Sequence, residues 1–213
     1  MIRGVIFDLG GVLIEWSNEI NYKAISASSG VSLDLVKSEL ERDLPQVQRG
    51  ELTESMWIRG FYESISKDPP REYEQIWTDT FKEGARIGVA LQDLILRLRK
   101  NVRVGALSNI EPTRLEILRQ WKVPEMFDAS VFSCEVGNRK PDHRPALISD
   151  SFIYHLAARR LNVEPRDCIY IDDNWNCVEG AKLTGMNGLH FKHIYDLEEN
   201  LRKYGILLKI VRG

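Results

Sequence analysis

Hydrophobic residues fall into two patterns along this chain. In the first, short apolar runs without polar alternation predict strands that are buried on both faces of a parallel sheet. These runs lie at Val5–Phe7, Val102–Leu107, Ala129–Ser133, Cys168–Ile171 and Gly188–Phe191. A further apolar stretch, Ile206–Val211, predicts a strand at the edge of the sheet.

The second pattern is the helical spacing of apolar residues, which predicts two groups of helices. The stretch that follows Leu13, up to about Arg99, shows no convincing strand, and its helices are expected at Asn18–Ser29, Ser32–Arg42, Thr53–Ser66, Arg71–Lys82 and Leu91–Leu98. The later helices alternate with the strands and are expected at Glu111–Trp121, Phe152–Leu161, Glu179–Met186 and Ile194–Tyr204. Ser32 and Thr53 are expected N-caps, because their hydroxyl oxygens can accept hydrogen bonds from the first backbone N–H groups of a helix.

Large aromatic residues recur at helical spacing in the first group of helices. They are Trp57, Phe61, Tyr73, Trp77 and Phe81. A small hydrophobic core explains this periodicity better than a cofactor site does.

Strands that alternate with helices predict an α/β fold with a Rossmann-like, doubly wound parallel sheet. The helical block separates the first strand from the others, so it is expected to be an insertion. We therefore predict an α/β core made of residues 1–14 and 89–213, and an α-helical cap made of residues 15–88. Ligands bind at the carboxyl ends of parallel strands, and the cap is expected to lie over that edge as a lid.

The overall composition narrows the class of partner. With 43% hydrophobic residues, 28% charged residues and a net charge of −2, the chain gives no support for a nucleic-acid or membrane partner. No apolar run approaches the ~18 residues that span a bilayer, and the N-terminal apolar segment breaks at Asp8, unlike a signal peptide. Cys134, Cys168 and Cys177 are scattered without metal-ligand spacing, which suits reduced thiols in a cytoplasmic protein.

Polar side chains follow three of the predicted strands, and a lysine lies in the loop after a fourth. They are Asp8, Ser108-Asn109, Asp172-Asp173 and, in the loop 134–151, Lys140. Carboxylates from separate loops suit Mg²⁺, while hydroxyl, amide and ammonium groups suit phosphate oxygens. A carboxylate at the end of an apolar strand is well placed to be a nucleophile. Taken singly, Asp8 also fits a residue that caps its strand, Asp172-Asp173 an N-cap pair of the next helix, and Lys140 an ordinary loop lysine. Their occurrence together favours one site.

The arrangement resembles the haloacid dehalogenase-like (HAD) hydrolase superfamily, and within it the phosphatases that carry a small helical cap. Four segments carry the resemblance: Phe7–Leu13 (FDLGGVL), Leu107–Asn109 (LSN), Gly137–Asp142 (GNRKPD) and Ile171–Asn174 (IDDN), the last followed by Val178–Ala181 and Gly185-Met186. In addition, Gly50–Thr53 (GELT) is similar to a cap turn of glucose-1-phosphate phosphatase and of the N-terminal domain of soluble epoxide hydrolase.

The resemblance implies a role for each of these residues. Asp8 would attack phosphorus and become an aspartyl phosphate, which water then hydrolyses. Mg²⁺ would be bound by the Asp8 carboxylate, the carbonyl group of Gly10 and Asp173, with Asp172 supporting Asp173. Phosphoryl oxygens would be held by Ser108, Asn109 and Lys140. An anionic nucleophile can approach an anionic phosphate only when a cation and hydrogen-bond donors screen the repulsion.

The chain departs from the family pattern in three places. Gly10 stands where most of these phosphatases carry the aspartate that serves as general acid and base. Cys177 stands where asparagine is frequent, and residues 143–151 look like an insertion beside Lys140 that could reshape the mouth of the pocket. Only the change at Gly10 bears on the proton transfers of the reaction.

The main hypothesis is a Mg²⁺-dependent phosphatase that acts on a small phosphorylated metabolite. One alternative is a catalytically weak phosphate-binding or regulatory protein with the same fold. Another is a haloacid dehalogenase in which Asp8 attacks carbon, although Asp172 and Asp173 would then be an unexplained anionic pair. The sequence names neither the substrate nor the oligomeric state.

Overall fold

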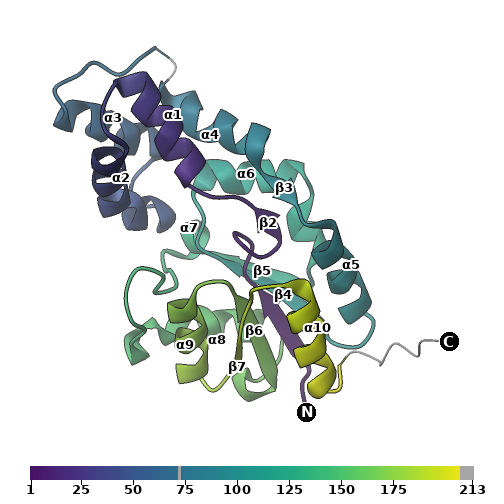
Figure 1. Cartoon of the computed structure of the whole chain (residues 1–213). Coiled ribbons are helices and arrows are strands. Elements are labelled where there is room, and N and C mark those ends of the chain that lie inside the picture. Colours follow the sequence, from purple (N-terminus) through teal and green to yellow (C-terminus); the bar gives the residue numbers. More distant parts are fainter. Residues whose placement is uncertain (72, 207–213) are drawn as a thin grey trace.

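A central parallel sheet organises the chain. The computed structural model describes residues 1–71 and 73–206, and within them five strands pair in parallel in the order β5-β4-β1-β6-β7 (Figure 1). The strands are β1 Gly4–Phe7, β4 Arg103–Ser108, β5 Ala129–Phe132, β6 Cys168–Asp172 and β7 Asn187–His190. All five are confirmed within one residue at each end. The edge strand predicted over residues 206–211 lies outside the described residues beyond Ile206.

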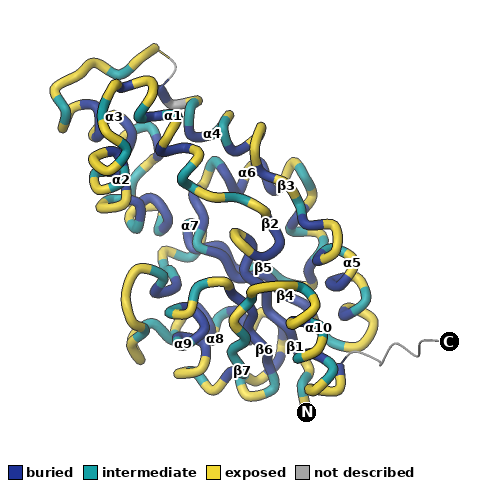
Figure 2. Tube along the Cα trace, in the orientation of Figure 1, coloured by how far each residue is buried: buried dark blue, intermediate teal, exposed yellow. Residues whose placement is uncertain are grey.

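Helices cover both faces of the sheet. On one face, Val5 and Phe7 pack with the apolar side chains of α5 Val89–Leu98, α6 Pro112–Gln120 and α10 Ile194–Lys203. On the other face, Ile6 packs with α8 Ser151–Arg160 and α9 Trp175–Leu183. Figure 2 shows that the buried positions concentrate along these strands. This is the doubly wound α/β fold that the sequence predicts.

Four further helices form a bundle with its own hydrophobic cluster, beyond the carboxyl ends of the strands (Figure 1). They are α1 Glu19–Ser29, α2 Leu33–Gln48, α3 Glu54–Ser64 and α4 Tyr73–Gly84. The predicted aromatic residues Trp57, Phe61, Tyr73 and Trp77 lie in this cluster, and Phe81 lies in the core beside the sheet. Ser32 and Thr53 accept hydrogen bonds from the backbone N–H groups of Leu35 and Met56, so both predicted N-caps are confirmed.

The prediction that the segment between Leu13 and Arg99 has no strand is wrong. Two-residue strands, β2 Ile14–Glu15 and β3 Arg86–Ile87, pair antiparallel where the chain enters and leaves the bundle. Two residues are too few to produce a hydrophobic alternation, so only the tertiary pairing reveals them. The predicted division of the chain at residues 14/15 and 88/89 falls at this ladder, and the division itself stays a prediction.

Other elements differ from the predictions at their ends. Helix α2 continues six residues past Arg42 and includes Pro45, and α9 begins at Trp175, after the N-cap Asn174. The single-turn helix α7 Ser133–Val136 takes up the last residue of the predicted strand and the start of the loop 134–151, and the 3₁₀ turn η2 Ile148–Asp150 lies near the end of this loop. The remaining 3₁₀ turns are η1 Val123–Met126 and η3 Pro165–Asp167. Among the described residues, no helix has the length and hydrophobicity to cross a bilayer.

Phe61→Ala tests the packing of the bundle. Phe61 is 3% exposed within the bundle cluster, so its truncation is expected to lower the free energy of unfolding by ~3–5 kcal/mol. Met56→Ala is the matched control on the same helix, because Met56 is 61% exposed and should change the stability by less than ~0.5 kcal/mol. Denaturant titration measures both variants. Equal losses would contradict this description of the cluster.

Candidate active site

The carboxyl edge of the sheet gathers the polar residues predicted from the sequence. Strand β1 leads into Asp8, β4 ends at Ser108-Asn109, and β6 ends at Asp172 and is followed by Asp173. Lys140 lies on the loop that follows β5 and α7. With Gly10, all seven predicted residues line one cavity of about 270 Å³. Parallel strands present their carboxyl ends on one side, so residues far apart in sequence meet there.

Lys140 is the buried centre of the site. Its side chain is 2% exposed, and its Nζ lies 2.9 Å from Asp8 Oδ1 and 2.7 Å from Asp172 Oδ2. Burial alone would lower the pKa of Lys140, but the carboxylates of Asp172 and Asp8 outweigh it, and the pKa is raised well above its ordinary value. The lysine is therefore a fixed positive charge between two acids.

Asp8 is held close to this charge. Its Oδ1 also accepts a hydrogen bond from the backbone N–H of Leu9 at 2.7 Å, which fixes the direction of the carboxyl group. Burial raises the pKa of Asp8 to about 7, against the lowering effect of Lys140. A further cation near Asp8 would favour the anionic form that a nucleophile needs.

Asp172 and Asp173 are adjacent in sequence but have different surroundings. Asp172 is completely buried; its Oδ2 accepts hydrogen bonds from Lys140 and from the hydroxyl of Tyr170, and its Oδ1 accepts one from the Asn174 backbone at 2.8 Å. Asp173 lies on the surface of the cavity. Its pKa is raised mainly because the carboxyl group is partly shielded from solvent, and secondly because Asp172 repels the negative charge. Asp172 is thus held by the protein, while Asp173 faces the space that a ligand would occupy.

A metal ion fits this group of carboxylates. Asp8, Asp172 and Asp173 each offer an oxygen, and these three oxygens lie within 4.8 Å of one another. A concentration of oxygen ligands with several negative charges is the environment that Mg²⁺ prefers. A bound cation would also offset the repulsion between these carboxylates, which adds to the effect of burial in raising the pKa values of Asp8 and Asp173.

Gly11 leaves room for the carboxylate of Asp173. Its φ of +73° lies in the left-handed region, and a Cβ atom there would come within 2.1 Å of Asp173 Oδ2. Gly10, by contrast, has no heavy atom within 4 Å of the place where its Cβ would lie. The turn therefore requires glycine at position 11 and has space for a side chain at position 10.

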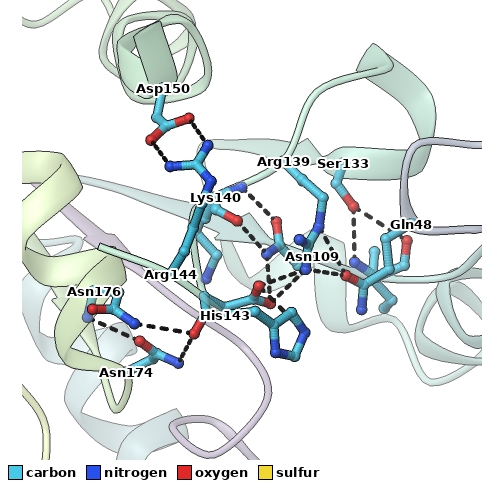
Figure 3. A network of polar contacts seen from close by, with 12 residues as sticks. Gln48, Asn109, Ser133, Arg139, Lys140, His143, Arg144, Asp150, Asn174 and Asn176 are labelled. Atoms are coloured by element: carbon cyan, nitrogen blue, oxygen red, sulfur yellow. Dashed lines mark hydrogen bonds and ion pairs between the residues drawn. The ribbon is translucent and has the colours of Figure 1, made fainter. Parts of the chain in front are cut away.

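Asn109 holds the loop that carries Lys140 (Figure 3). Its Oδ1 accepts a hydrogen bond from the Lys140 backbone N–H at 2.8 Å, and its Nδ2 donates to the Lys140 carbonyl at 3.0 Å and to Asp142 Oδ2 at 2.9 Å. The side-chain amide of Asn109 is therefore engaged by protein groups. Its observed contribution is to position the lysine.

The same network reaches the helical bundle. Arg139 donates to both oxygens of Asp142, at 2.6 and 2.7 Å, and also to Gln48 Oε1 at the end of α2, at 2.8 Å (Figure 3). Asn174 donates to the Asp142 carbonyl at 2.9 Å. Asp142 thus joins the lysine loop to the carboxyl ends of β4 and β6, and Arg139 joins it to the bundle.

Several residues of the cavity are absent from the sequence-based site. They are Trp16, Asn18, Gln48, Phe81, Glu111, Arg114 and Asp142. Glu111 and Asp142 lie within three residues of predicted site residues, and this proximity is a signal that could have been used. The bundle residues have no local signal, because only the tertiary packing brings them to the edge of the sheet.

The departures from the family pattern have distinct locations. Cys177 is buried against the cavity, and burial raises the pKa of its thiol. His143 is half-exposed, with Nε2 3.5 Å from Asp142 Oδ1. Residues 143–151, all within the described chain, do not line the cavity that holds Asp8. Within this segment, Arg144 forms an ion pair with Asp150 at 2.6 Å.

Known proteins share this sequence pattern and fold. A model of the haloacid dehalogenase-like hydrolase family matches residues 2–185. A phosphorylated carbohydrates phosphatase of Thermotoga maritima is 29% identical over 198 residues, which cover 89% of this chain and 84% of the relative. A phosphoglycolate phosphatase of Nitrosospira multiformis is 23% identical, with 86% and 80% covered.

Solved structures show the same fold. A HAD family enzyme of Bacteroides thetaiotaomicron, in a magnesium complex, has a TM-score of 0.74 at 21% identity and covers 94% of this chain and 98% of its own. A HAD-like family hydrolase of Porphyromonas gingivalis has a TM-score of 0.74 at 24% identity, with 95% and 98% covered. At these identities the likeness concerns the fold alone.

Gly11→Ala tests the cradle around Asp173. The left-handed φ and the contact with Asp173 Oδ2 are expected to reduce the free energy of unfolding by ~1–3 kcal/mol. The displaced carboxylate should also weaken Mg²⁺ binding ~10-fold or more, as measured by calorimetric titration. Gly185→Ala is the matched control, because Gly185 also has a left-handed φ (+87°) but lies outside the cavity with no atom near the position of its Cβ, so Mg²⁺ binding should stay unchanged. If the two variants bind Mg²⁺ equally well, Asp173 does not hold the ion in the way described.

Proposed function

The chain belongs to the haloacid dehalogenase-like hydrolase family, and on this premise we propose that it is a magnesium-dependent phosphatase acting on a small phosphorylated metabolite. One observation carries the proposal. Asp8 lies 2.9 Å from the buried Lys140, within a three-carboxylate cluster that opens into a cavity. The phosphatases of Thermotoga maritima and Nitrosospira multiformis support the same reaction type.

Asp8, the Gly10 carbonyl and Asp173 would hold the magnesium ion. Asp172 would support the site from behind, because its oxygens already bind Lys140, Tyr170 and the Asn174 backbone. When bound, Mg²⁺ supplies the positive charge that offsets the repulsion between Asp8 and the phosphoryl group. A related HAD family enzyme of Bacteroides thetaiotaomicron, crystallised with magnesium and inorganic phosphate, supports this assignment.

The chain's own residues would carry the reaction in two steps. An oxygen of Asp8 attacks phosphorus in line, the new bond forms as the bond to the leaving oxygen breaks, and an aspartyl phosphate results. Water then attacks this phosphorus, which releases phosphate and restores the carboxylate. Lys140 and Ser108 would bind phosphoryl oxygens. Asn109 would hold Lys140 in place through the contacts of its side chain and contribute its backbone N–H to the phosphate site.

The helical bundle would serve as the cap. We divide the chain into a core of residues 1–14 and 89–213 and a cap of residues 15–88. The bundle's separate hydrophobic cluster supports this division, and Trp16, Asn18 and Gln48 line the cavity from the cap side. A cap in this position would exclude water from the phosphate and recognise the leaving group.

The dehalogenase alternative does not account for the geometry. Attack on carbon would need Asp8 alone, and it would leave Asp172 and Asp173 as two further acids beside an anionic substrate. A phosphatase uses all three carboxylates. The alternative of a catalytically weak phosphate-binding protein is favoured by one feature. Gly10 has no side chain that could protonate the leaving group.

Asp8→Asn tests the nucleophile. The amide keeps the size of the side chain and removes its negative charge, so turnover of p-nitrophenyl phosphate with Mg²⁺ is expected to fall by more than ~10³-fold. Asp93→Asn is the control, because Asp93 lies exposed on α5, outside the cavity. Circular dichroism checks that both variants fold. Near wild-type turnover in folded Asp8→Asn would show that another group attacks.

Gly10→Asp tests how the enzyme manages without the usual acid. A positioned acid contributes ~10²–10⁴-fold to the departure of a poor leaving group, so the wild type should depend steeply on the leaving-group pKa across a series of phosphate esters. The open space at Gly10 accepts a side chain, and the aspartate is expected to flatten this dependence. A shallow dependence in the wild type would instead point to another acid, such as His143 or a cap residue.

A further inference from the structure

The cavity has few cations, and each is already paired. Among the described residues that line it, Lys140 and Arg114 are the only lysine or arginine side chains. Lys140 bridges Asp8 and Asp172 at the phosphate end. Arg114 therefore determines whether the other end of the cavity can bind a second anionic group.

Arg114 is enclosed by aromatic rings and neutral amides. Its guanidinium carbon lies 4.4 Å from the Trp77 ring centroid, 5.0 Å from that of Phe81 and 5.5 Å from that of Trp16. Its two terminal nitrogens donate to Asn18 Oδ1 at 2.7 Å and to Asn21 Oδ1 at 2.8 Å. The cation is thus held in place by the bundle.

Glu111 neutralises this arginine. Its Oε2 lies 3.6 Å from Arg114 Nη1, and the side chains of Glu111 and Arg114 are only 1% and 6% exposed. A second carboxylate or phosphate on the substrate would meet Glu111 as well as Arg114, so it would gain no net attraction and would lose its hydration. The pair therefore disfavours an anionic leaving group.

Glu111 and Arg114 each have one polar atom without a hydrogen-bond partner. Among the described residues, four buried side-chain polar atoms have no partner, and two of them are Glu111 Oε1 and Arg114 Nε. One of these atoms is an acceptor and the other a donor. A hydroxyl group can both donate and accept, so it could satisfy either atom without adding charge. The rings of Trp16 and Phe81 line the same cavity and offer apolar faces to the carbon skeleton.

From these observations we infer that the cavity accepts phosphate esters of small, neutral, hydroxyl-rich alcohols, and that the Glu111–Arg114 pair is the specificity determinant against a second anionic group. The inference rests on the proposed phosphatase function. Its size limit follows from the cavity of about 270 Å³, which is smaller than the ~300–1,000 Å³ of pockets for drug-sized ligands.

The wild-type chain is first tested on a panel of substrates with Mg²⁺. A hexose 1-phosphate and a pentitol 5-phosphate represent the neutral class, and phosphoglycolate and a hexose bisphosphate represent the anionic class. The expected kcat/KM is at least ~10-fold higher for the neutral class. Preference for phosphoglycolate or the bisphosphate would overturn the inference.

Glu111→Gln then tests the determinant itself. The amide leaves Arg114 without its compensating anion, so the ratio of kcat/KM for phosphoglycolate to that for the pentitol phosphate should rise ~10-fold. Glu116→Gln is the matched control, because it removes one negative charge in the same way but from an exposed position on α6. Equal ratios in the two variants would refute the role of Glu111. If Glu111→Gln does not fold, Asn18→Asp adds an anion beside Arg114 and should lower the ratio below that of the wild type.

Two generic substrates separate the possible failures. If p-nitrophenyl phosphate and acetyl phosphate are not hydrolysed with Mg²⁺, the proposed phosphatase function is wrong and this inference falls with it. If both are hydrolysed but the anionic class is preferred, only the inference about Glu111 and Arg114 is wrong.

Discussion

The active site depends on the buried contacts of one lysine. Lys140 lies between Asp8 and Asp172, with Nζ–O distances of 2.9 and 2.7 Å. Removing such a charge from water is costly unless carboxylates and further hydrogen bonds compensate for it. Here two acids offset one ammonium group, and the remaining negative charge is available for a cation. The lysine therefore fixes the position of Asp8, the proposed nucleophile, and the remaining negative charge would favour binding of the proposed Mg²⁺ ion.

The rest of the structure keeps this lysine in place. The sheet supplies Asp8 from β1 and Asp172 from β6, while Asn109 at the end of β4 binds the Lys140 backbone on both its N–H and its carbonyl. Arg139 connects the same loop to Gln48 of the bundle. The position of the bundle over the cavity and the position of Lys140 are thus linked by continuous hydrogen bonds. A change in one has a physical route to the other.

Sequence patterns predicted the sheet and the ends of its strands well, because an apolar run that stops at a polar residue marks both the strand and its functional edge. They could not predict β2 and β3, which exist only because two distant segments meet. Nor could they show that the Asn109 side chain binds protein groups, or that Arg114 lies among three aromatic rings. Contacts between the bundle and the core depend on packing that no local pattern encodes.

The central claim is that Asp8 becomes covalently phosphorylated. The most direct measurement mixes the wild-type chain with Mg²⁺ and p-nitrophenyl phosphate, stops turnover in acid, and locates phosphate on peptides by mass spectrometry. Because Gly10 provides no base for the second step, the account predicts that phosphate accumulates on the peptide that contains Asp8. Product formation without phosphate on that peptide, or with phosphate on a different residue, would contradict it.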